Sequence, residues 1–430
     1  MKDLKGKKLL ILGGNPASKE IVNEAKKLGV YTIVTDWYDT KRSPAKLIAD
    51  EYWNEEVFRP DILSNLIKEK GVDGIFTGYT DSYLIPYVEL GKMSSLPYWG
   101  THENIRMSIT KDLFKEACKK SGVPVVPWKK VNAQNYVNEL SDLEPPMVFK
   151  PVDNSGSRGV FKCYRKEDIL SLCEHSLEYS QSKEVLVERL MNAHNEFSVY
   201  YIMDQGQIYL TGMGDRYVYE INSEVAPVGQ GMLFPSTRLG QWIKEMDPLL
   251  KQFFKDNEMN NGFVFVQGFY EEGKFYIHEI GYRLNGGFSF KLVEHFCNYN
   301  QVHQLVRFSL TGKMDENEIK KSDPYFGGGI GMIMTVSMKK GKVSHVEGVE
   351  EIKKMPGVVQ FYQLKEIGDE ITSEGTTAEA FAYIMLAASS KDTLKTLINK
   401  IKASLHVNDE QENNMIIPLI DPDRLRFNDK

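Results

Sequence analysis

The chain opens with a strand, helix and strand in succession, and this unit is the strongest constraint on the fold. An apolar run at 9–12 is followed by the turn Gly13-Gly14-Asn15-Pro16, an amphipathic segment at 18–28 and a β-prone run at 31–36. Short apolar strands separated by a helix are typical of a parallel sheet that is covered on both faces. The pattern repeats at 61–77, which predicts an open α/β domain over residues 1–105.

Polar residues follow these strands and should meet at the carboxyl edge of the sheet, where α/β sheets bind ligands. They are Asp36, Tyr79 and Asp81. Two interpretations are open: these side chains recognise a substrate amino group or carboxylate, or they only cap helices. The glycine turn also suggests an NAD-linked oxidoreductase, but the full G-x-G-x-x-G spacing is absent.

Composition limits the class of protein. With 430 residues, 42% of them apolar, the chain can bury a large core and form two to four domains. The net charge of −6 and the lack of a basic run exclude binding to nucleic acid or anionic membranes through bulk charge. The four cysteines show no metal-binding spacing. No signal-like segment or long apolar run is present, so we expect a cytoplasmic protein.

A second informative stretch runs from Val148 to Val160. Lys150 should lie at the end of a buried strand, where a lysine needs an anion. The loop after it is rich in residues that expose backbone amides or donate hydrogen bonds to phosphate, as a flap over phosphates requires. These residues are Ser155, Gly156, Ser157, Arg158 and Gly159. The alternative is an ordinary surface hairpin.

The second half of the chain supplies acidic and glycine-rich segments. Two β-prone runs at 262–270 and 274–280 are joined by Glu271-Glu272-Gly273, which is a strong hairpin signal. The first run carries Gln267, and the second carries Glu279. A glycine-punctuated loop follows at 281–287. Beyond it the sequence predicts a helix over 291–308, a hairpin at Lys340-Gly341-Lys342 and a final helix over 391–405.

Taken in this order, these features resemble the ATP-grasp superfamily, which includes biotin carboxylase, the carbamoyl-phosphate synthetase large chain and the L-amino-acid ligases. The resemblance covers nearly the whole chain and implies a multidomain α/β and α+β fold. It implies four parts: a pre-ATP-grasp α/β domain at 1–105, a small lobe with the connecting helix and phosphate flap at 106–190, a large lobe with the metal and acyl-phosphate site at 191–325, and a β-rich subdomain at 326–430.

The resemblance also implies roles for individual residues. Glu279 would be a Mg2+ ligand, with Mn2+ as an alternative ion, and Gln267 occupies the place of a second ligand. Arg283, Asn285 and Arg216 would steady the acyl phosphate, and the amides of Gly286 and Gly287 would contact substrate. ATP would be bound by Lys111, Lys150, the flap residues 155–159, the hinge residues Glu188, Arg189 and Leu190, and the ribose-binding Glu196.

Two positions depart from the family pattern. Family members usually have an acidic residue where this chain has Gln267, and many have asparagine where it has Gly281. A neutral amide binds magnesium more weakly than a carboxylate, so one of the usual metal positions should be weaker or differently liganded. Alternatively, Gln267 only completes a hydrogen-bond network between strands.

These observations predict a ligase that uses ATP to activate a carboxylate as an acyl phosphate and joins it to an amine or a thiol. The resemblance favours an amino-acid ligase over a biotin carboxylase. Its partners would be small-molecule carboxylates and amines, not nucleic acid or membranes, and it would form a homodimer, as relatives commonly do. The alternative function is a nucleotide-binding scaffold with weakened catalysis.

Overall fold

The N-terminal domain is the open parallel sheet that the sequence predicts. In the computed structural model, which describes residues 4–153, 159–221, 227–376 and 379–427, the sheet order is β3 (Glu51–Trp53), β2 (Tyr31–Thr35), β1 (Lys8–Leu12) and β4 (Gly74–Thr77). All neighbouring strands are parallel. The connecting helices are α1 (Ser18–Lys27), α2 (Pro60–Lys70) and α3 (Leu84–Ser94). Strands β1, β2 and β4 are almost entirely buried, as expected for a sheet covered on both faces, whereas the edge strand β3 is partly exposed.

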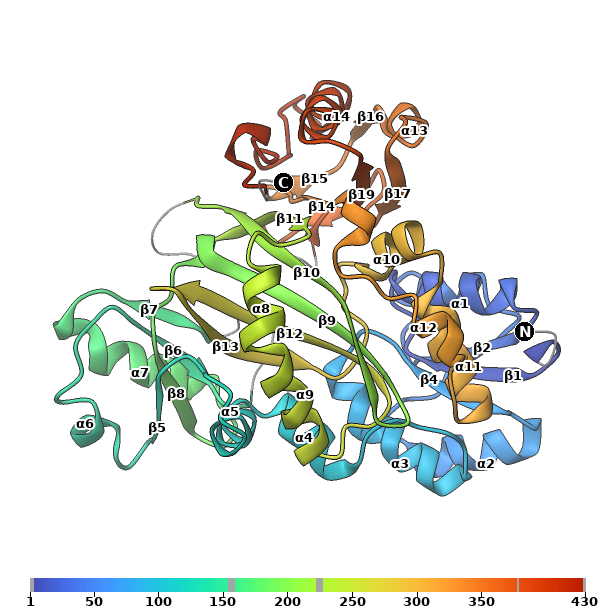
Figure 1. Ribbon diagram of the computed structural model, residues 1–430, viewed down its shortest axis with the longest axis horizontal. Helices are drawn as coiled ribbons and strands as arrows, with labels where there is room; N and C mark the ends of the chain where they lie inside the picture. The colour runs from blue at the N-terminus through green and yellow to red at the C-terminus, as the bar shows by residue number, and fades with distance from the viewer. Residues whose placement is uncertain (1–3, 154–158, 222–226, 377–378, 428–430) are drawn as a thin grey trace.

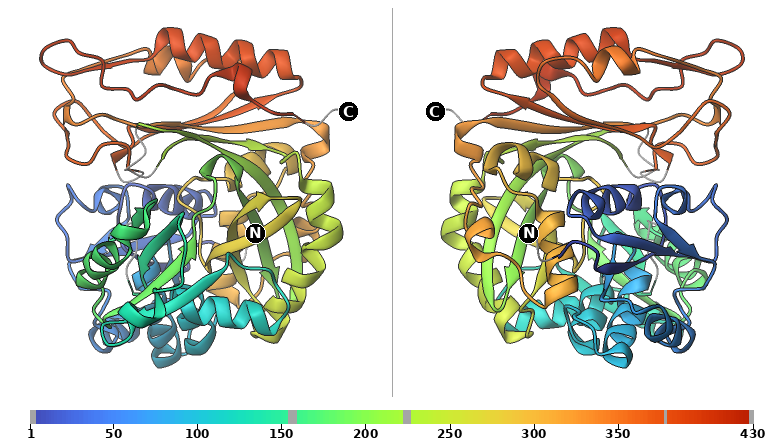
Figure 2. Two further views of the ribbon diagram at one scale, coloured as in Figure 1. Left: turned by 90° about the vertical axis from the view of Figure 1, so that its left-hand side faces the viewer. Right: turned by 90° about the vertical axis from the view of Figure 1, so that its right-hand side faces the viewer.

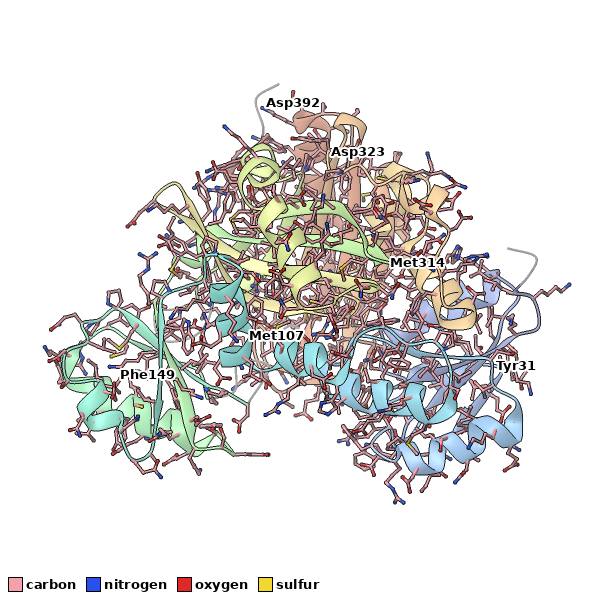
Figure 3. The ribbon with its side chains drawn as sticks, turned by 60° about the horizontal axis from the view of Figure 1, so that its bottom comes forward. Tyr31, Met107, Phe149, Met314, Asp323 and Asp392 are labelled. Carbon is pink, nitrogen blue, oxygen red and sulfur yellow. The ribbon has the colours of Figure 1, made fainter. Side chains whose placement is uncertain are left out.

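Two helices, α4 (His102–Ile109) and α5 (Lys111–Lys120), lead into a small lobe. Its antiparallel sheet has the order β5 (Trp128–Asn132), β8 (Glu184–Arg189), β6 (Met147–Pro151) and β7 (Phe161–Cys163). Helices α6 (Tyr136–Glu139) and α7 (Ile169–Glu178) cover it. Figures 1 and 3 place this lobe, which contains Phe149, and the N-terminal domain, which contains Tyr31, at opposite ends of the long axis.

A single antiparallel sheet of eight strands joins the large lobe to the C-terminal part. Its order is β13 (Lys274–Gly281), β12 (Gly262–Glu271), β9 (Glu196–Asp204), β10 (Gln207–Tyr219), β11 (Val228–Phe234), β14 (Ile330–Val336), β19 (Ala382–Ala388) and β17 (Val358–Gln363). The hairpin predicted between β12 and β13 is confirmed, with an irregularity in register after Gln267. The sheet crosses the predicted domain boundary at 326 without interruption.

The helix predicted over 291–308 is wrong, because two helices occupy this region. α10 (Phe290–Cys297) ends where Asn298 adopts a left-handed conformation with φ of 55°. α11 (Gln301–Thr311) begins after Asn300, whose side-chain oxygen accepts a hydrogen bond from the His303 N–H at 3.0 Å. Asparagine tolerates both roles, so a pair of asparagines ends one helix and starts the next. The other helices of this lobe are α8 (Leu239–Glu245), α9 (Asp247–Asp256) and α12 (Glu316–Ile319).

The hairpin predicted at Lys340-Gly341-Lys342 is also wrong. The short strand β15 (Gly341–Lys342) pairs with the distant β18 (Glu370–Ile371), while β14 pairs with β19. A glycine between lysines marks a turn only if the following segment returns along the preceding strand, and here it does not. A further pair joins β16 (His345–Glu347) to β20 (His406–Asn408), and the helices are α13 (Val349–Ile352) and α14 (Lys391–Ser404).

Three apolar cores hold these parts. The largest is shared by the N-terminal domain, α5 and the large lobe, the second lies between the C-terminal strands and α14, and the third is confined to the small lobe. Figure 2 shows the C-terminal part lying over the rest of the molecule with α14 on its outer side. Among the described residues, no helix is both long and apolar enough to cross a membrane.

Candidate functional site

Two of the predicted phosphate-binding lysines lie close to the same end of the small lobe. Lys150 lies on β6, and its Nζ is 2.6 Å from Oε2 of Glu188 on the neighbouring strand β8. Lys111 begins α5 and donates from Nζ to the Pro151 carbonyl at 3.3 Å. Burial lowers the pKa of Lys111, the nearby Glu279 carboxylate opposes this effect, and Lys150 reinforces it. Glu279 and Lys150 are therefore both near enough to Lys111 for their charges to shift its pKa, although the three residues come from different elements.

A third lysine, which was not predicted from the sequence, lies at the same place. Lys115 lies one turn after Lys111 on α5 and is completely buried, with Nζ 3.0 Å from Oε1 of Glu188. Burial and hydrogen bonding are not visible in a local sequence pattern, but the spacing of four residues from Lys111 is a signal, because it puts both lysines on one helix face.

The predicted hinge residues Glu188 and Arg189 line a cavity of about 400 Å³. The other lining residues are Pro127, Trp128, Lys129, Leu143, Glu144, Pro146, Met147 and Val187. The N–H groups of Arg189 and Leu190 already donate to the carbonyls of Pro127 and Pro146, at 3.0 and 3.2 Å. A ligand in this cavity would therefore contact groups other than these two N–H groups. The Arg189 guanidinium also lies 5.0 Å from the Tyr276 ring centroid, which connects the hinge to β13.

Glu279 and Gln267 face each other across strands β13 and β12. Glu279 is exposed at the surface, and desolvation by the protein atoms around it raises the pKa of its carboxyl, as does the nearby Asp81 carboxylate. Lys111 and Arg283 act in the opposite direction. Gln267 donates weakly from Nε2 to Ser198 Oγ at 3.4 Å. Within the described ranges, no group of three or more His, Cys, Asp or Glu side chains could hold a metal ion.

Gly281 has no room for a side chain. A Cβ atom there would lie 2.1 Å from Cζ of Phe265, on the paired strand β12. The same phenyl ring lies 5.1 Å from the Arg283 guanidinium. An aromatic ring that supports Arg283 thus fills the space beside position 281.

Arg283 is held by a carboxylate from the N-terminal domain. Its Nε and Nη2 atoms donate to the two oxygens of Asp81, both at 2.6 Å, in a bidentate pair. Asp81 begins the single turn at Asp81–Tyr83 that follows β4, so the carboxyl edge of the N-terminal sheet reaches the large lobe here. The structure therefore brings together one predicted substrate residue and one predicted catalytic residue.

The other two residues predicted at this sheet edge are held by other contacts. Asp36 is buried and accepts hydrogen bonds from the Gly14 N–H at 3.0 Å and Ser43 Oγ at 3.3 Å, so it holds the glycine turn. The Tyr79 ring packs 5.7 Å from the Phe288 ring, and its pKa is raised by burial and by the nearby Glu20 and Glu24.

The glycine loop after Arg283 ends in a tightly packed aromatic residue. Asn285 accepts a hydrogen bond from Ser289 Oγ at 2.9 Å, and the space beside Gly286 is open. Gly287 is followed by Phe288, which is buried and has φ of 57°, an uncommon value for a bulky residue. The Phe288 ring stacks on Tyr362 of β17 at 4.1 Å between ring centroids.

Glu196 and Arg216 form their own ion pair on strands β9 and β10, with 2.6 Å between Oε1 and Nη1. Both are inside the large lobe, and the pairing raises the pKa of Arg216. Of the predicted flap, Ser155, Gly156, Ser157 and Arg158 lie outside the described residues. Gly159 is described: it has φ of 74°, and its carbonyl accepts a hydrogen bond from Ser176 Oγ at 2.9 Å.

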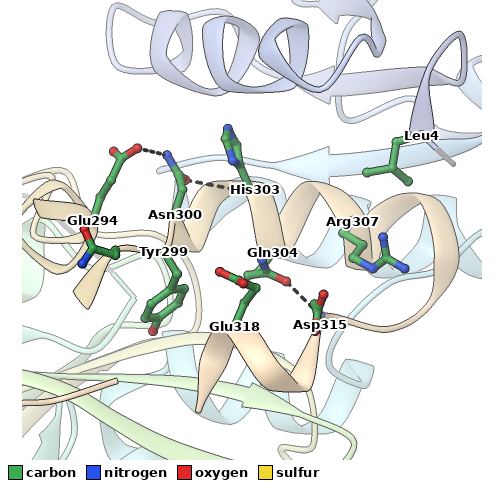
Figure 4. A pocket seen from close by; sticks show the side chains of 10 residues that line it. Leu4, Glu294, Tyr299, Asn300, His303, Gln304, Arg307, Asp315 and Glu318 are labelled. Atoms are coloured by element: carbon green, nitrogen blue, oxygen red, sulfur yellow. Dashed lines mark hydrogen bonds between the residues drawn. The ribbon is translucent and has the colours of Figure 1, made fainter. Parts of the chain in front are cut away.

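A second pocket, of about 500 Å³, lies between α11, α12 and the start of the chain (Figure 4). Some of its polar side chains bond to other lining residues: Asn300 donates to Glu294, and Gln304 accepts from the Asp315 N–H. Beside it, Lys291 of the large lobe forms ion pairs with Glu20 and Glu24 of α1. These ion pairs join the N-terminal domain to the large lobe.

Comparison with known proteins agrees with this arrangement. A family model described as L-amino acid ligase C-terminal domain 2 matches residues 334–410. The formate-dependent phosphoribosylglycinamide formyltransferase of Prochlorococcus marinus subsp. pastoris is 26% identical over 205 residues, which cover 45% of this chain and 50% of that protein. The chain thus matches about half the length of this curated relative.

Two solved structures are similar over almost the whole chain. The L-amino acid ligase from Bacillus licheniformis has a TM-score of 0.76 with 17% identity, covering 94% of this chain and 99% of that one. The biotin carboxylase domain of the Hydrogenobacter thermophilus 2-oxoglutarate carboxylase, solved with MgADP, ADP and bicarbonate, has a TM-score of 0.73 with 15% identity, covering 96% and 91%.

The predicted fold class is confirmed: this chain is a multidomain protein of the ATP-grasp fold. Within that fold, residues 334–410 match the L-amino acid ligase model, and the L-amino acid ligase and the biotin carboxylase domain share the overall architecture.

Proposed function

We propose that this protein is a ligase that uses ATP to join a carboxylate to an amine. The observation that carries the proposal is the convergence of Lys111, Lys150 and Glu279 beside the Asp81–Arg283 pair. In the proposed reaction, a carboxylate oxygen attacks the terminal phosphorus of ATP and ADP leaves. The amine nitrogen then bonds to the acyl carbon and loses a proton as phosphate departs. Both steps depend mainly on positioning and on neutralising negative charge.

The small lobe would bind the nucleotide. Lys111 and Lys150 would contact the phosphates, with Ser155, Gly156, Ser157, Arg158 and Gly159 closing over them. The hinge residues Glu188, Arg189 and Leu190, of which the first two line the cavity, would bind the adenine. Glu196 would contact the ribose, for which it would have to leave or share Arg216. The bound ADP in the biotin carboxylase neighbour supports a nucleotide site in this fold.

Glu279 and Gln267 fit a magnesium site that the nucleotide completes, because they offer one charged and one neutral oxygen from adjacent strands. Mg2+ bound there would neutralise phosphate charge, and Mn2+ is an alternative ion with similar ligand preferences. The MgADP complex of the neighbour supports this assignment.

The acyl-phosphate side would be formed by Arg283, by Asn285, Gly286 and Gly287, and by Arg216. Arg283 would bind the phosphorylated carboxylate, and Asp81, which orients Arg283, would attract the ammonium form of the amine. Asp36 and Tyr79 have less support as substrate residues, because Asp36 holds the glycine turn and Tyr79 packs against Phe288.

We also propose that the chain divides into four parts, at 1–105, 106–190, 191–325 and 326–430. We further propose that it forms a homodimer, which the dimer named for the biotin carboxylase neighbour supports.

A second candidate function is a nucleotide-binding scaffold. It is favoured by the single carboxylate at the metal position, since position 267 is a glutamine and the space beside Gly281 is filled by Phe265.

A coupled assay of ADP release, run over amino acids, dicarboxylates and small amines, separates the two functions. The ligase predicts release only when a carboxylate and an amine are both present, and it predicts that Arg283→Ala lowers turnover while ATP affinity is roughly kept. ATP binding without turnover on any member of the panel, and no effect of Arg283→Ala, would favour the scaffold.

A further inference from the structure

Lys115 is a buried charge that the proposed reaction does not use. Its side chain is 0% exposed, and its Nζ lies 3.0 Å from Oε1 of Glu188. The Nζ atom also donates to the Val126 carbonyl at 3.3 Å. A lysine is rarely sealed from water unless an acid compensates its charge, so Lys115 and Glu188 form a fixed pair inside the protein.

Glu188 has a second cation on its other oxygen. Lys150 Nζ is 2.6 Å from Oε2, and the Lys150 side chain is 19% exposed. The Glu188 carboxylate therefore pairs with two ammonium groups. That of Lys115 is fully buried, and that of Lys150 is partly exposed to solvent. The Glu188 side chain itself is only 2% exposed, so it depends on these cations for its charge.

We propose that Lys115 is a positioning residue that stays with Glu188 and so releases Lys150 to the phosphates of the nucleotide. This inference rests on the ATP site proposed above. Without Lys115, moving Lys150 away from Glu188 would leave an unpaired carboxylate in the core, which is strongly unfavourable. With Lys115 in place, the carboxylate keeps one partner while Lys150 turns to a triphosphate.

The pKa values of these groups follow from that geometry. Burial alone would raise the pKa of Glu188, but Lys150 and Lys115 together lower it to about 2. Burial lowers the pKa of Lys115, and Glu188 opposes the change. The carboxylate is therefore charged at neutral pH and requires at least one ammonium partner throughout the proposed cycle.

The test is to measure the dissociation constants of ATP and adenosine by calorimetry for wild type, Lys115→Met and the double variant Lys115→Met/Glu188→Gln. We expect Lys115→Met to weaken ATP binding about tenfold or more, because Glu188 then retains Lys150. Adenosine carries no phosphate, so its affinity should stay within about twofold. The Glu188 side chain is buried against the two lysines, so Glu188→Gln leaves the backbone of the proposed hinge in place, and removing the acid as well should restore ATP affinity to within about threefold of wild type.

Lys130→Met is the matched control. Lys130 pairs with Asp112 at 2.9 Å and with Glu184 at 3.3 Å on the same lobe, but does not contact Glu188 in either pair. Its substitution should leave both affinities unchanged.

Several results would overturn the inference. Equal loss of ATP and adenosine binding without rescue by Glu188→Gln would mean that Lys115 only supports the fold. A double variant that folds but still binds ATP weakly would mean that Lys115 contacts phosphate directly, and this variant carries the test if Lys115→Met alone does not fold. Wild-type protein that fails to bind ATP overturns the proposed function as well, whereas unchanged ATP affinity in Lys115→Met overturns the inference alone.

Discussion

At the scale of single residues, Gly281 gives a physical reason for one departure from the family pattern. The Phe265 ring lies where a side chain at 281 would have to go, and the same ring lies under Arg283. An aromatic ring near a guanidinium contributes about 0.5–2 kcal/mol and restricts its position. The space that a ligand side chain at 281 would need is thus occupied by the ring beside Arg283.

This packing predicts that Gly281→Ala destabilises the protein. A methyl group 2.1 Å from the Phe265 ring forces a rearrangement of the core, and overpacking of this kind costs about 1–3 kcal/mol. Gly286→Ala is the control, because nothing lies within 4 Å of a Cβ at that position. Urea unfolding should give a lower free energy for the first variant only, and equal values for both variants would contradict the packing described here.

The low pKa of Glu188 predicts that the free energy of unfolding decreases as the pH falls. Its pKa is about 2 in the folded protein against 4.5 for an ordinary glutamate, so the unfolded chain binds its proton first as the pH falls. The stabilisation is complete above about pH 4.5 and is lost progressively toward pH 2. Between pH 5 and pH 3, urea unfolding should show a loss on the order of 1–2 kcal/mol in wild type beyond that in Lys115→Met/Glu188→Gln. Parallel pH profiles for the two proteins would argue against a depressed pKa.

At the scale of elements, the loop after Arg283 depends on the C-terminal part of the chain. Phe288 stacks on Tyr362 at 4.1 Å with 14° between the ring planes. Phe288 also has an uncommon backbone conformation, which the packing must maintain. Strand β17 therefore supports the loop of Asn285, Gly286 and Gly287 through the contact between Tyr362 and Phe288.

Tyr362→Ala should consequently loosen this loop. Loss of a stacked, largely enclosed aromatic ring costs about 2 kcal/mol. Hydrogen exchange should speed up at 285–290 as well as in β17, while the exposed control Tyr164→Ala leaves both segments unchanged. Faster exchange in β17 without any change in the loop would disprove the support.

The elements also explain which predictions from sequence succeeded. The strands of the N-terminal sheet and the β12–β13 hairpin follow from local alternation, apolar runs and turn residues, and the structure has them. The single helix predicted at 291–308 was wrong because asparagine is also found within helices, so the two asparagines that divide this region did not mark a break in the sequence. The β15–β18 pair joins segments far apart in sequence, for which no local signal exists.

The residues of the candidate site also fall into those that the sequence predicts and those that it does not. Lys150, Glu279 and Arg283 were predicted from the segments around them and from family resemblance. Lys115 was missed because its burial is not visible in the local sequence, although its spacing of four residues from Lys111 puts both lysines on one helix face. The Asp81–Arg283 pair spans 202 residues, so its geometry depends on how the N-terminal domain packs against the large lobe.

At the scale of the whole molecule, the three cores predict how the protein moves. The N-terminal domain and the large lobe share one core, while the small lobe has a separate and smaller one. A body with few buried contacts to its neighbours opens at a lower free-energy cost. The small lobe, which carries Lys150 and Glu188, is thus the part that can move relative to the rest.

Hydrogen exchange tests this prediction. Amides of β5, β6, β7 and β8 should exchange faster than those of β9 and β12, and addition of MgATP should protect the small lobe most, because the nucleotide would bridge it to the large lobe. The N-terminal domain, which shares a core with the large lobe, is the internal reference. Uniform exchange across both lobes, unchanged by MgATP, would contradict independent motion.

The central claim is that ATP transfers its terminal phosphoryl group to a carboxylate. The most direct measurement uses the carboxylate substrate found in the ADP-release panel, labelled with 18O in its carboxyl group, and determines the mass of the phosphate released during product formation. An acyl phosphate intermediate predicts that one labelled oxygen moves from the carboxylate into each phosphate. Product formed with unlabelled phosphate would contradict the proposed reaction.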